Sequence, residues 1–220
     1  MAAPRAARTR DVIVDAALAL FRERGFEKTT MRAVAARAGV SVGSAYYYFG
    51  SKDELVQGFY DHLVGEHAAA ALPQLVEPGP LGERLAASLH AWITVAEPYH
   101  AFAGPFFSIA ARPDNPLSPF SAVSSPARDA AIELYRTVTA GSTTSIDATL
   151  AGELPELLWL YHLGIVLFWV HDTSTGSART RLLVDRTAPM IERLARLSRL
   201  PIARPLTRQA IDLLDLLRTG

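Results

Sequence analysis

A run of serine, tyrosine and lysine side chains between residues 41 and 52 has the composition of a surface that binds nucleic acid. Tyr46, Tyr47 and Tyr48 are consecutive, so on a helix they are splayed at steps of roughly 100° and cannot all enter a core. Tyrosine hydroxyls hydrogen-bond phosphate oxygens, and tyrosine rings pack on thymine methyl groups. Lys52 adds a positive charge near backbone N–H groups, a combination that binds phosphate. The run therefore predicts contacts to DNA.

The residues just before this run predict a sharp turn between two helices. Gly39 can adopt the positive φ of a tight turn, Val40 can fill the angle between the helices, and Ser41 can cap the next helix. That next helix, 42–49, is short enough to lie in a major groove, and the small residues at its start let the backbone approach the bases. The pattern is typical of a helix-turn-helix.

The chain before the turn has the spacing of two further helices. Apolar residues repeat at three and four positions over 10–24, and Gly25 is placed to end that helix. Thr29 or Thr30 then offers a hydroxyl N-cap for a second helix, which runs to Arg37.

Helical patterns also fill most of the chain after the turn. Ser51 with Glu54 three residues later matches a capping box, which opens a fourth helix. A proline-rich loop is expected at 112–126. The other expected helices cover about 81–96, 99–111, 127–139, 147–172, 178–199 and 205–218.

These elements predict an all-α protein with two domains. Residues 1–8 form a flexible N-terminal arm, and 9–52 form a three-helix helix-turn-helix domain. A helix at 52–70 links it to a helical bundle at 71–220, where we expect dimerisation and ligand binding.

Composition excludes several classes of protein. The chain has no cysteine, which rules out disulfides, thiolate metal sites and cysteine nucleophiles. Residues 1–52 hold nine Lys or Arg against four Asp or Glu, as a polyanion-binding segment requires, whereas 53–175 hold four against fourteen. The apolar run Leu157–Val170 is shorter than the ~20 residues of a membrane span. We therefore expect a cytoplasmic protein without a membrane partner.

One motif could indicate an enzyme. Residues 39–43 read G-x-S-x-G, which in hydrolases marks a nucleophile elbow on a strand of an α/β sheet. Here a helix precedes the motif, so Ser41 is interpreted as a cap. No catalytic residue, metal site or cofactor is predicted.

Several short pieces of the first quarter of the chain match one family at fixed spacing. They are Ala16-Ala17…Leu20-Phe21, Gly25-Phe26, Thr29-Thr30, Val34-Ala35, Ala38-Gly39-Val40-Ser41, Gly43-Ser44-Ala45-Tyr46-Tyr47-Tyr48-Phe49 and Ser51-Lys52-Asp53-Glu54-Leu55. In these pieces, residues 9–63 resemble the DNA-binding region of the tetracycline-repressor (TetR) family. The match departs at Ala45, where the family usually has a larger aliphatic residue.

The resemblance implies roles for individual residues. Thr30 would cap the second helix, and Arg32 would reach base edges or phosphate. Tyr47 would lie at the flank of the base-reading residues, and Tyr48 and Lys52 would hold the DNA backbone. The residues facing bases would be Val42, Gly43, Ser44 and Tyr46.

The resemblance also implies a homodimer, paired through helices at about 154–171 and 180–200, that binds a palindromic operator in double-stranded DNA. A small hydrophobic effector would release it from that operator. The candidate pocket is a set of aromatic residues with one histidine, which could equally fill a core: Trp92, Tyr99, Phe102, Phe106, Phe107, Trp159 and His162.

Two other functions remain open from the sequence. A helical protein–protein adaptor would share the fold but not bind an operator, although the tyrosine row and Lys52 argue against it. An activator would share both the fold and the operator, because the sign of regulation depends on where the operator lies.

Overall fold

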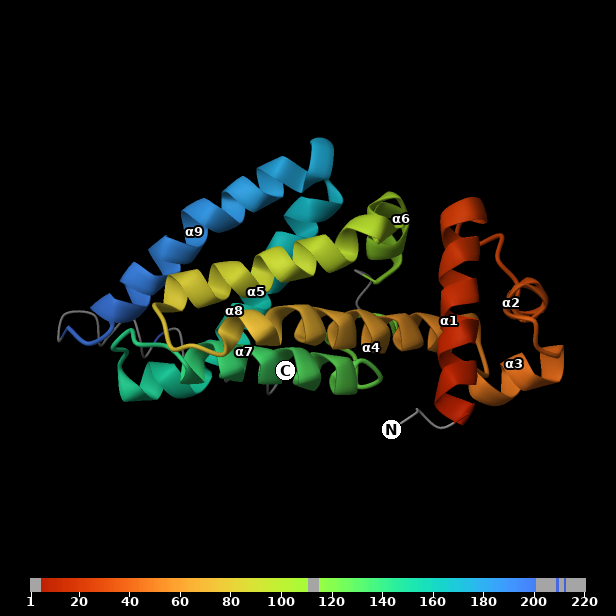
Figure 1. Ribbon diagram of the computed structural model, residues 1–220, viewed down its shortest axis with the longest axis horizontal. Coiled ribbons are helices and arrows are strands. Elements are labelled where there is room, and N and C mark those ends of the chain that lie inside the picture. Colours follow the sequence, from red (N-terminus) through yellow and green to blue (C-terminus); the bar gives the residue numbers. More distant parts are fainter. Residues whose placement is uncertain (1–4, 111–114, 201–208, 210–211, 213–220) are drawn as a thin grey trace. The chain divides into compact units, whose positions relative to one another are not determined.

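The computed structural model describes residues 5–110, 115–200, 209 and 212 (Figure 1). These residues form helices and connecting turns, so the predicted all-α class is confirmed. The expected helix at 205–218 lies outside the described ranges. In chain order the elements are α1 (Arg5–Arg24), α2 (Met31–Ala38), α3 (Val42–Tyr48), α4 (Lys52–Ala71), η1 (Leu72–Leu75), α5 (Leu81–Ala96), η2 (Glu97–Tyr99), α6 (His100–Ala110), α7 (Ser125–Ala140), α8 (Ala148–Val170), η3 (Thr175–Ser177) and α9 (Ala178–Leu197).

The chain divides into two compact units. The first holds Met1–Gly65 together with Pro98–Asp129, and the second holds Glu66–Glu97 together with Ala130–Gly220. The unit boundaries therefore fall inside α4, η2 and α7. The sequence predicts a domain boundary at residue 71. In the structure, the later segment Pro98–Asp129 also belongs to the unit formed by the N-terminal helices.

Hydrogen bonds and ring contacts hold this later segment in the first unit. Gln57 on α4 donates to the Pro116 carbonyl at 3.0 Å, and the Tyr60 hydroxyl donates to the Leu117 carbonyl at 2.9 Å. Phe106 on α6 packs edge-on against Tyr60, with ring centres 5.5 Å apart. The same hydrophobic core includes buried side chains of α1 that recur at helical spacing: Ile13, Val14, Ala17, Leu18 and Phe21.

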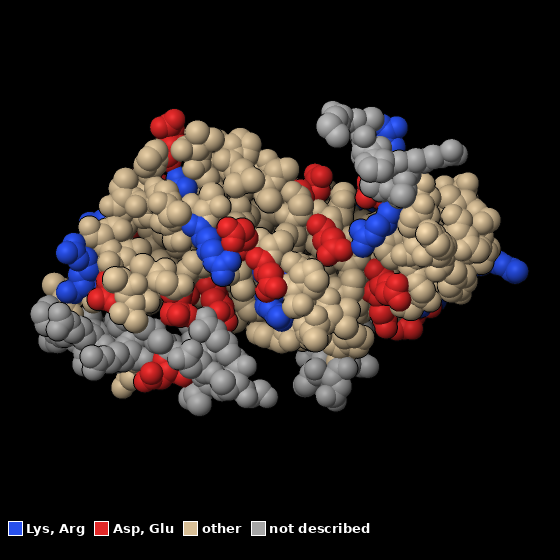
Figure 2. Space-filling view, turned by 90° about the horizontal axis from the view of Figure 1, so that it is seen from below, with Lys and Arg blue, Asp and Glu red and all other residues tan. Residues whose placement is uncertain are grey.

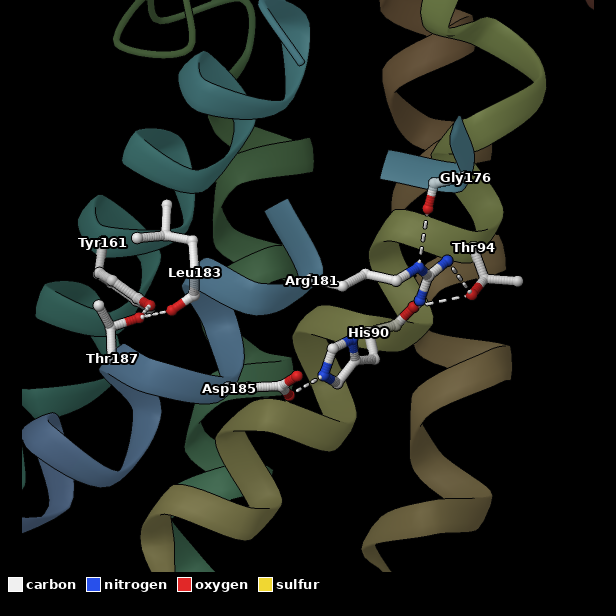
Figure 3. Close-up of polar contacts among 8 residues, drawn as sticks. All are labelled: His90, Thr94, Tyr161, Gly176, Arg181, Leu183, Asp185 and Thr187. Atoms are coloured by element: carbon white, nitrogen blue, oxygen red, sulfur yellow. Dashed lines mark hydrogen bonds and ion pairs between the residues drawn. The ribbon is translucent and has the colours of Figure 1, made fainter. Parts of the chain in front are cut away.

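The second unit packs α5 against α9, with α8 contacting α9 as well. Polar contacts fix the two contacting faces (Figure 3). His90 on α5 lies 2.7 Å from the Asp185 carboxylate on α9, and Arg181 donates to the Thr94 hydroxyl at 3.2 Å. On the α8 side of α9, the hydroxyls of Tyr161 and Thr187 are paired.

The buried His67 imidazole should make the stability of the second unit depend on pH. Burial lowers the pKa of His67 to about 4, although a hydrogen bond to the Ser88 carbonyl at 2.9 Å opposes the shift. A histidine in an unfolded chain titrates near 6.5. Because the folded pKa is the lower one, the contribution to stability is complete above pH 6.5 and is lost as the pH falls toward 4.

We expect the His67 contribution to the free energy of unfolding to fall by roughly 3 kcal/mol between pH 7 and pH 4. Urea denaturation at both pH values, in the wild type and in His67→Gln, measures it. The variant removes the titrating group, so its free energy should vary less with pH. Equal pH dependence in the two proteins would contradict the assignment.

Candidate nucleic-acid interface

The predicted turn between α2 and α3 is confirmed atom by atom. The Thr30 hydroxyl caps α2 by accepting a hydrogen bond from the Ala33 amide at 3.2 Å. Gly39 ends α2 with φ +67°, a left-handed conformation that favours glycine. The Ser41 hydroxyl then caps α3 by accepting from the Ser44 amide at 3.0 Å. Val40 is half-buried against the core, as its expected place between the helices requires.

The short helix α3 turns one narrow side inward. Ala45 and, one turn later, Phe49 are buried in the core of the first unit. Ala45 is fully enclosed, so the small residue at this position leaves no room for a larger aliphatic one without repacking. Tyr46 and Tyr47 point outward and are 52% and 83% exposed. Val42 and Gly43 are also exposed, and Ser44 is half-buried.

Tyr48 and Lys52, which are expected to hold the DNA backbone, also make contacts inside the chain. Tyr48 is half-buried against the core, and its ring meets the Tyr47 ring edge-on at 5.2 Å between centres. The Lys52 ammonium donates to the Phe26 carbonyl at 3.1 Å and lies 4.4 Å from the centre of the Phe26 ring. It thereby ties the start of α4 to the turn between α1 and α2.

The start of α4 departs slightly from the predicted capping box. The Ser51 hydroxyl accepts from the Glu54 amide at 3.2 Å, as expected. The Glu54 carboxylate, however, accepts from the Gly50 amide at 2.9 Å rather than from that of Ser51. The second hydrogen bond of the capping box, from a backbone amide to the Glu54 carboxylate, is thus displaced by one residue and satisfies the Gly50 amide in the loop before the helix.

A shallow, open depression of about 460 Å³ lies at the N-terminal ends of α2 and α4, beside Tyr46. Helix N-termini present N–H donors and a positive dipole end, which favour an anion. Two carboxylates, Glu27 and Asp53, line the same depression. Phosphate binding there would therefore rest on hydrogen-bond donors and Lys52 more than on net charge.

Ion pairs offset part of the basic charge of the first segment. Arg10 pairs with Asp61 at 3.1 Å, and Arg37 pairs with Glu23 at 2.5 Å. Figure 2 shows acidic and basic side chains interspersed on the face that it displays. Arg32 on α2 is exposed, and no described group pairs with its guanidinium. Lys28, just before the start of α2, is exposed, and it and Lys52 are the only lysines in the chain.

The predicted aromatic pocket is divided between the two units. Tyr99 and Phe106 belong to the first unit, where both rings pack on Phe59 at 5.0 and 6.5 Å between centres. Trp92 and His162 belong to the second unit, with ring centres 4.9 Å apart. Trp159 is also buried in the second unit and Phe107 is half-buried in the first, whereas the Phe102 side chain lies outside the description. Helical spacing alone could not separate the two groups.

A helix-turn-helix with an exposed tyrosine face, on a chain with a second helical unit, defines a helix-turn-helix transcriptional regulator. Residues 13–58 match the family of bacterial regulatory proteins, tetR family, and residues 84–215 match the tetracyclin repressor-like C-terminal domain. The chain belongs to the TetR family of transcriptional regulators, which bind DNA and are not enzymes.

Similar proteins agree with this assignment. The chain is 44% identical over 62 residues to the HTH-type transcriptional repressor KstR2 of Rhodococcus jostii, a match that covers 26% of this chain and 30% of KstR2. The TetR regulator of Nitrosomonas europaea shares the fold, with a TM-score of 0.61 and 22% identity over 82% of this chain and 96% of that one. FadR of Bacillus subtilis, solved with stearoyl-CoA, has a TM-score of 0.61 and 16% identity over 81% and 96% of the two chains.

Proposed function

We propose that the protein is a cytoplasmic, homodimeric repressor that binds a palindromic operator and is released from it by a small hydrophobic effector. The observation that carries the proposal is the outward face of α3. Ala45 and Phe49 anchor this helix in the core, and the base-reading residues expected from the sequence stand on its exposed side. A helix held in this way can enter a major groove without rearranging its own packing.

The proposed contacts fall into two groups. Residues of α3 read base edges, with Tyr47 at the flank, and Arg32 reaches base edges or phosphate. Thr30 and Lys52, which line the depression at the starts of α2 and α4, contact phosphates, and Tyr48 contacts the DNA backbone as well. Because Tyr48 and Lys52 also pack inside the chain, they position the reader as well as contacting DNA. The base-reading residues on α3 are Val42, Gly43, Ser44 and Tyr46.

The dimer is proposed from apolar surface that one chain leaves uncovered on α8 and α9. The helix α8 is long and apolar enough to span a membrane. Only 39% of its most apolar stretch is buried within the chain, so much of that apolar stretch is uncovered. Leu167 and Phe168 on α8 are exposed. On α9 the exposed apolar residues near its end fall on one stripe at helical spacing: Met190, Leu194 and Leu197.

The exposed residues share helix sides with the contact between α8 and α9. Phe168 lies on the same side of α8 as Tyr161, two turns toward the C-terminal end, and Leu194 lies on the same side of α9 as Thr187, also two turns toward the C-terminal end. Tyr161 and Thr187 are the pair whose hydroxyls meet between the two helices. A second copy of the chain would bury these exposed apolar residues of α8 and α9 along a two-fold axis.

Selection of duplexes from a random DNA pool tests the proposal. We expect a palindrome with half-sites about one helical turn apart, whose position relative to promoters then distinguishes repression from activation. Enrichment of no sequence at low or moderate salt would contradict operator binding and favour a helical adaptor.

Replacing both Tyr46 and Tyr47 with alanine should weaken operator binding by about thirtyfold, roughly 2 kcal/mol, because both side chains are exposed and available to DNA. Fluorescence anisotropy with the selected operator measures the loss. Thermal unfolding should change little. Phe120→Ala, at an exposed aromatic in the same unit, is the matched control and should bind as the wild type does.

Lys52→Met should separate the two roles assigned to this lysine. Loss of the hydrogen bond to the Phe26 carbonyl should lower the free energy of unfolding by about 1 kcal/mol. Loss of a phosphate contact should also reduce the slope of log affinity against log salt by about one. Lys28→Met is the control variant: it removes an exposed lysine that lacks those carbonyl partners, so it shows how much the loss of one lysine charge by itself changes stability and the salt slope. A lower stability with an unchanged salt slope would restrict Lys52 to the structural role.

A further inference from the structure

A cluster of rings at the centre of the second unit has features that its packing alone does not account for. It takes His67 from α4, Trp92 from α5, Tyr135 from α7 and His162 from α8. The His162 ring is surrounded edge-on by the other three, at 5.6 Å from His67, 4.9 Å from Trp92 and 5.8 Å from Tyr135 between centres. Trp169, two turns further along α8, closes on Trp92 at 5.1 Å.

The two histidines of this cluster differ in how their polar atoms are satisfied. His67 Nε2 lies 2.9 Å from the Ser88 carbonyl oxygen and 3.3 Å from the Ser88 hydroxyl. His162 Nε2 is buried and has no hydrogen-bond partner among the described residues. The Tyr135 hydroxyl is buried too, and burial raises its pKa, although the nearby Ser88 side chain opposes this rise in part. No described group makes a hydrogen bond of normal geometry to the Tyr135 hydroxyl. Polar atoms left in this state cost free energy and disfavour the closed arrangement.

The cluster is also electrically neutral at physiological pH. Burial, and then the neighbouring His67, lowers the pKa of His162 well below its usual range. Burial lowers the pKa of His67 to about 4. The described surroundings supply no carboxylate or guanidinium that offsets the desolvation of His162. A charged ligand group placed beside it would lose its hydration without gaining an opposite charge.

We propose that His162 is the polar anchor of the effector site, and that the effector is an uncharged, largely aromatic molecule with one hydroxyl group. The proposal rests on the repressor function proposed above and names the ligand chemistry of that regulation. Faces of Trp92 and Trp169 pack on the apolar part of the ligand. The hydroxyl, both a donor and an acceptor, satisfies His162 Nε2 and the Tyr135 hydroxyl.

The same geometry explains how such a ligand regulates. The Trp92 ring contacts both His162 and Trp169, so a ligand that enters between Trp92 and His162 parts these rings and moves α5 from α8. His67 belongs to α4, a continuous helix whose first residues from Lys52 lie in the first unit. A ligand that binds the parted arrangement more tightly therefore shifts the protein toward conformations in which α4 is displaced. Since α4 begins directly after α3, such a shift can alter DNA binding.

Calorimetric titration of the full-length protein tests the site independently of DNA. The probes are phenol, 2-naphthol and 4-phenylphenol, each beside its parent hydrocarbon and the carboxylate of the same ring system. We expect at least one hydroxyl probe to bind at least tenfold tighter than its hydrocarbon and carboxylate counterparts. His162→Phe, which keeps a ring of similar size, should remove this advantage, whereas His171→Phe at the exposed end of α8 should not.

Two further measurements complete the test. His162→Phe should raise Tm, because it removes a buried polar atom without a partner. If it fails to fold, His162→Leu, which also has no hydrogen-bonding group, replaces it in the titration. The hydroxyl probe that binds should also weaken binding to the selected operator at least tenfold.

Binding of no hydroxyl probe, equal binding of a carboxylate, equal binding to His162→Phe, or an unchanged operator affinity would each overturn the proposal. Failure to select any operator would instead refute the repressor function, and the titrations would still report on the site.

Discussion

Replacement of Arg84 with methionine is expected to lower the free energy of unfolding of the second unit by about 4 kcal/mol. Arg84 is buried on α5, and its guanidinium donates to carbonyl oxygens near the ends of η1 and α7. The distances are 2.9 Å to Val138, 3.1 Å to Leu75, 2.6 Å to Glu77 and 2.9 Å to Thr137.

The large effect follows from the number of groups that depend on one side chain. Carbonyls at a helix C-terminus have no partner within the helix and carry the negative end of its dipole, so a buried cation satisfies them in both respects. Methionine fills much of the volume but donates no hydrogen bond, which leaves four acceptors near the end of α7 and around η1 without their donor.

Urea denaturation followed by circular dichroism measures the change. Arg136→Met on α7 is the matched control, because its guanidinium pairs with Glu133 in an exposed ion pair worth at most about 1 kcal/mol. Gly141→Ala should also destabilise the unit, since an added Cβ would collide with the Arg84 guanidinium. A loss below about 1 kcal/mol for Arg84→Met would show that water replaces the guanidinium.

Local features of the fold could be predicted from the sequence. The cap at Ser41 and the left-handed Gly39 each depend on atoms within four residues, so spacing and residue type determine them. For α2, spacing alone left Thr29 and Thr30 open as the cap, and Thr30 is the one that caps it. Phe49 is buried one turn after Ala45, because the helical period brings both to the inward side of α3.

Features that depend on tertiary contacts could not be predicted in this way. The carbonyls bound by Lys52 lie 25 and 26 residues earlier in the chain, and the hydrogen bonds of Arg84 reach positions up to 54 residues away. Helical periodicity identifies an inward face but not its partner helix. For this reason Tyr99 and Trp92 were expected in one aromatic pocket, whereas they belong to different units.

Leu194→Asp is expected to convert the protein to a monomer and to weaken operator binding at least a hundredfold. Leu194 is 65% exposed on α9, so the fold of one chain loses little when it becomes charged. In the proposed dimer the same carboxylate would be buried against apolar surface, which strongly disfavours association. A single reader then contacts one half-site, and the loss corresponds to roughly 3 kcal/mol of binding free energy.

Sedimentation velocity measures the oligomeric state, and anisotropy with the selected operator measures affinity. Val76→Asp introduces the same charge at an apolar residue that is 73% exposed just after η1, outside α8 and α9, and it should leave both quantities unchanged. A dimer that persists in Leu194→Asp would place the interface elsewhere. A monomer that still binds the operator with wild-type affinity would mean that one reader suffices, because the second half-site would then add nothing to binding.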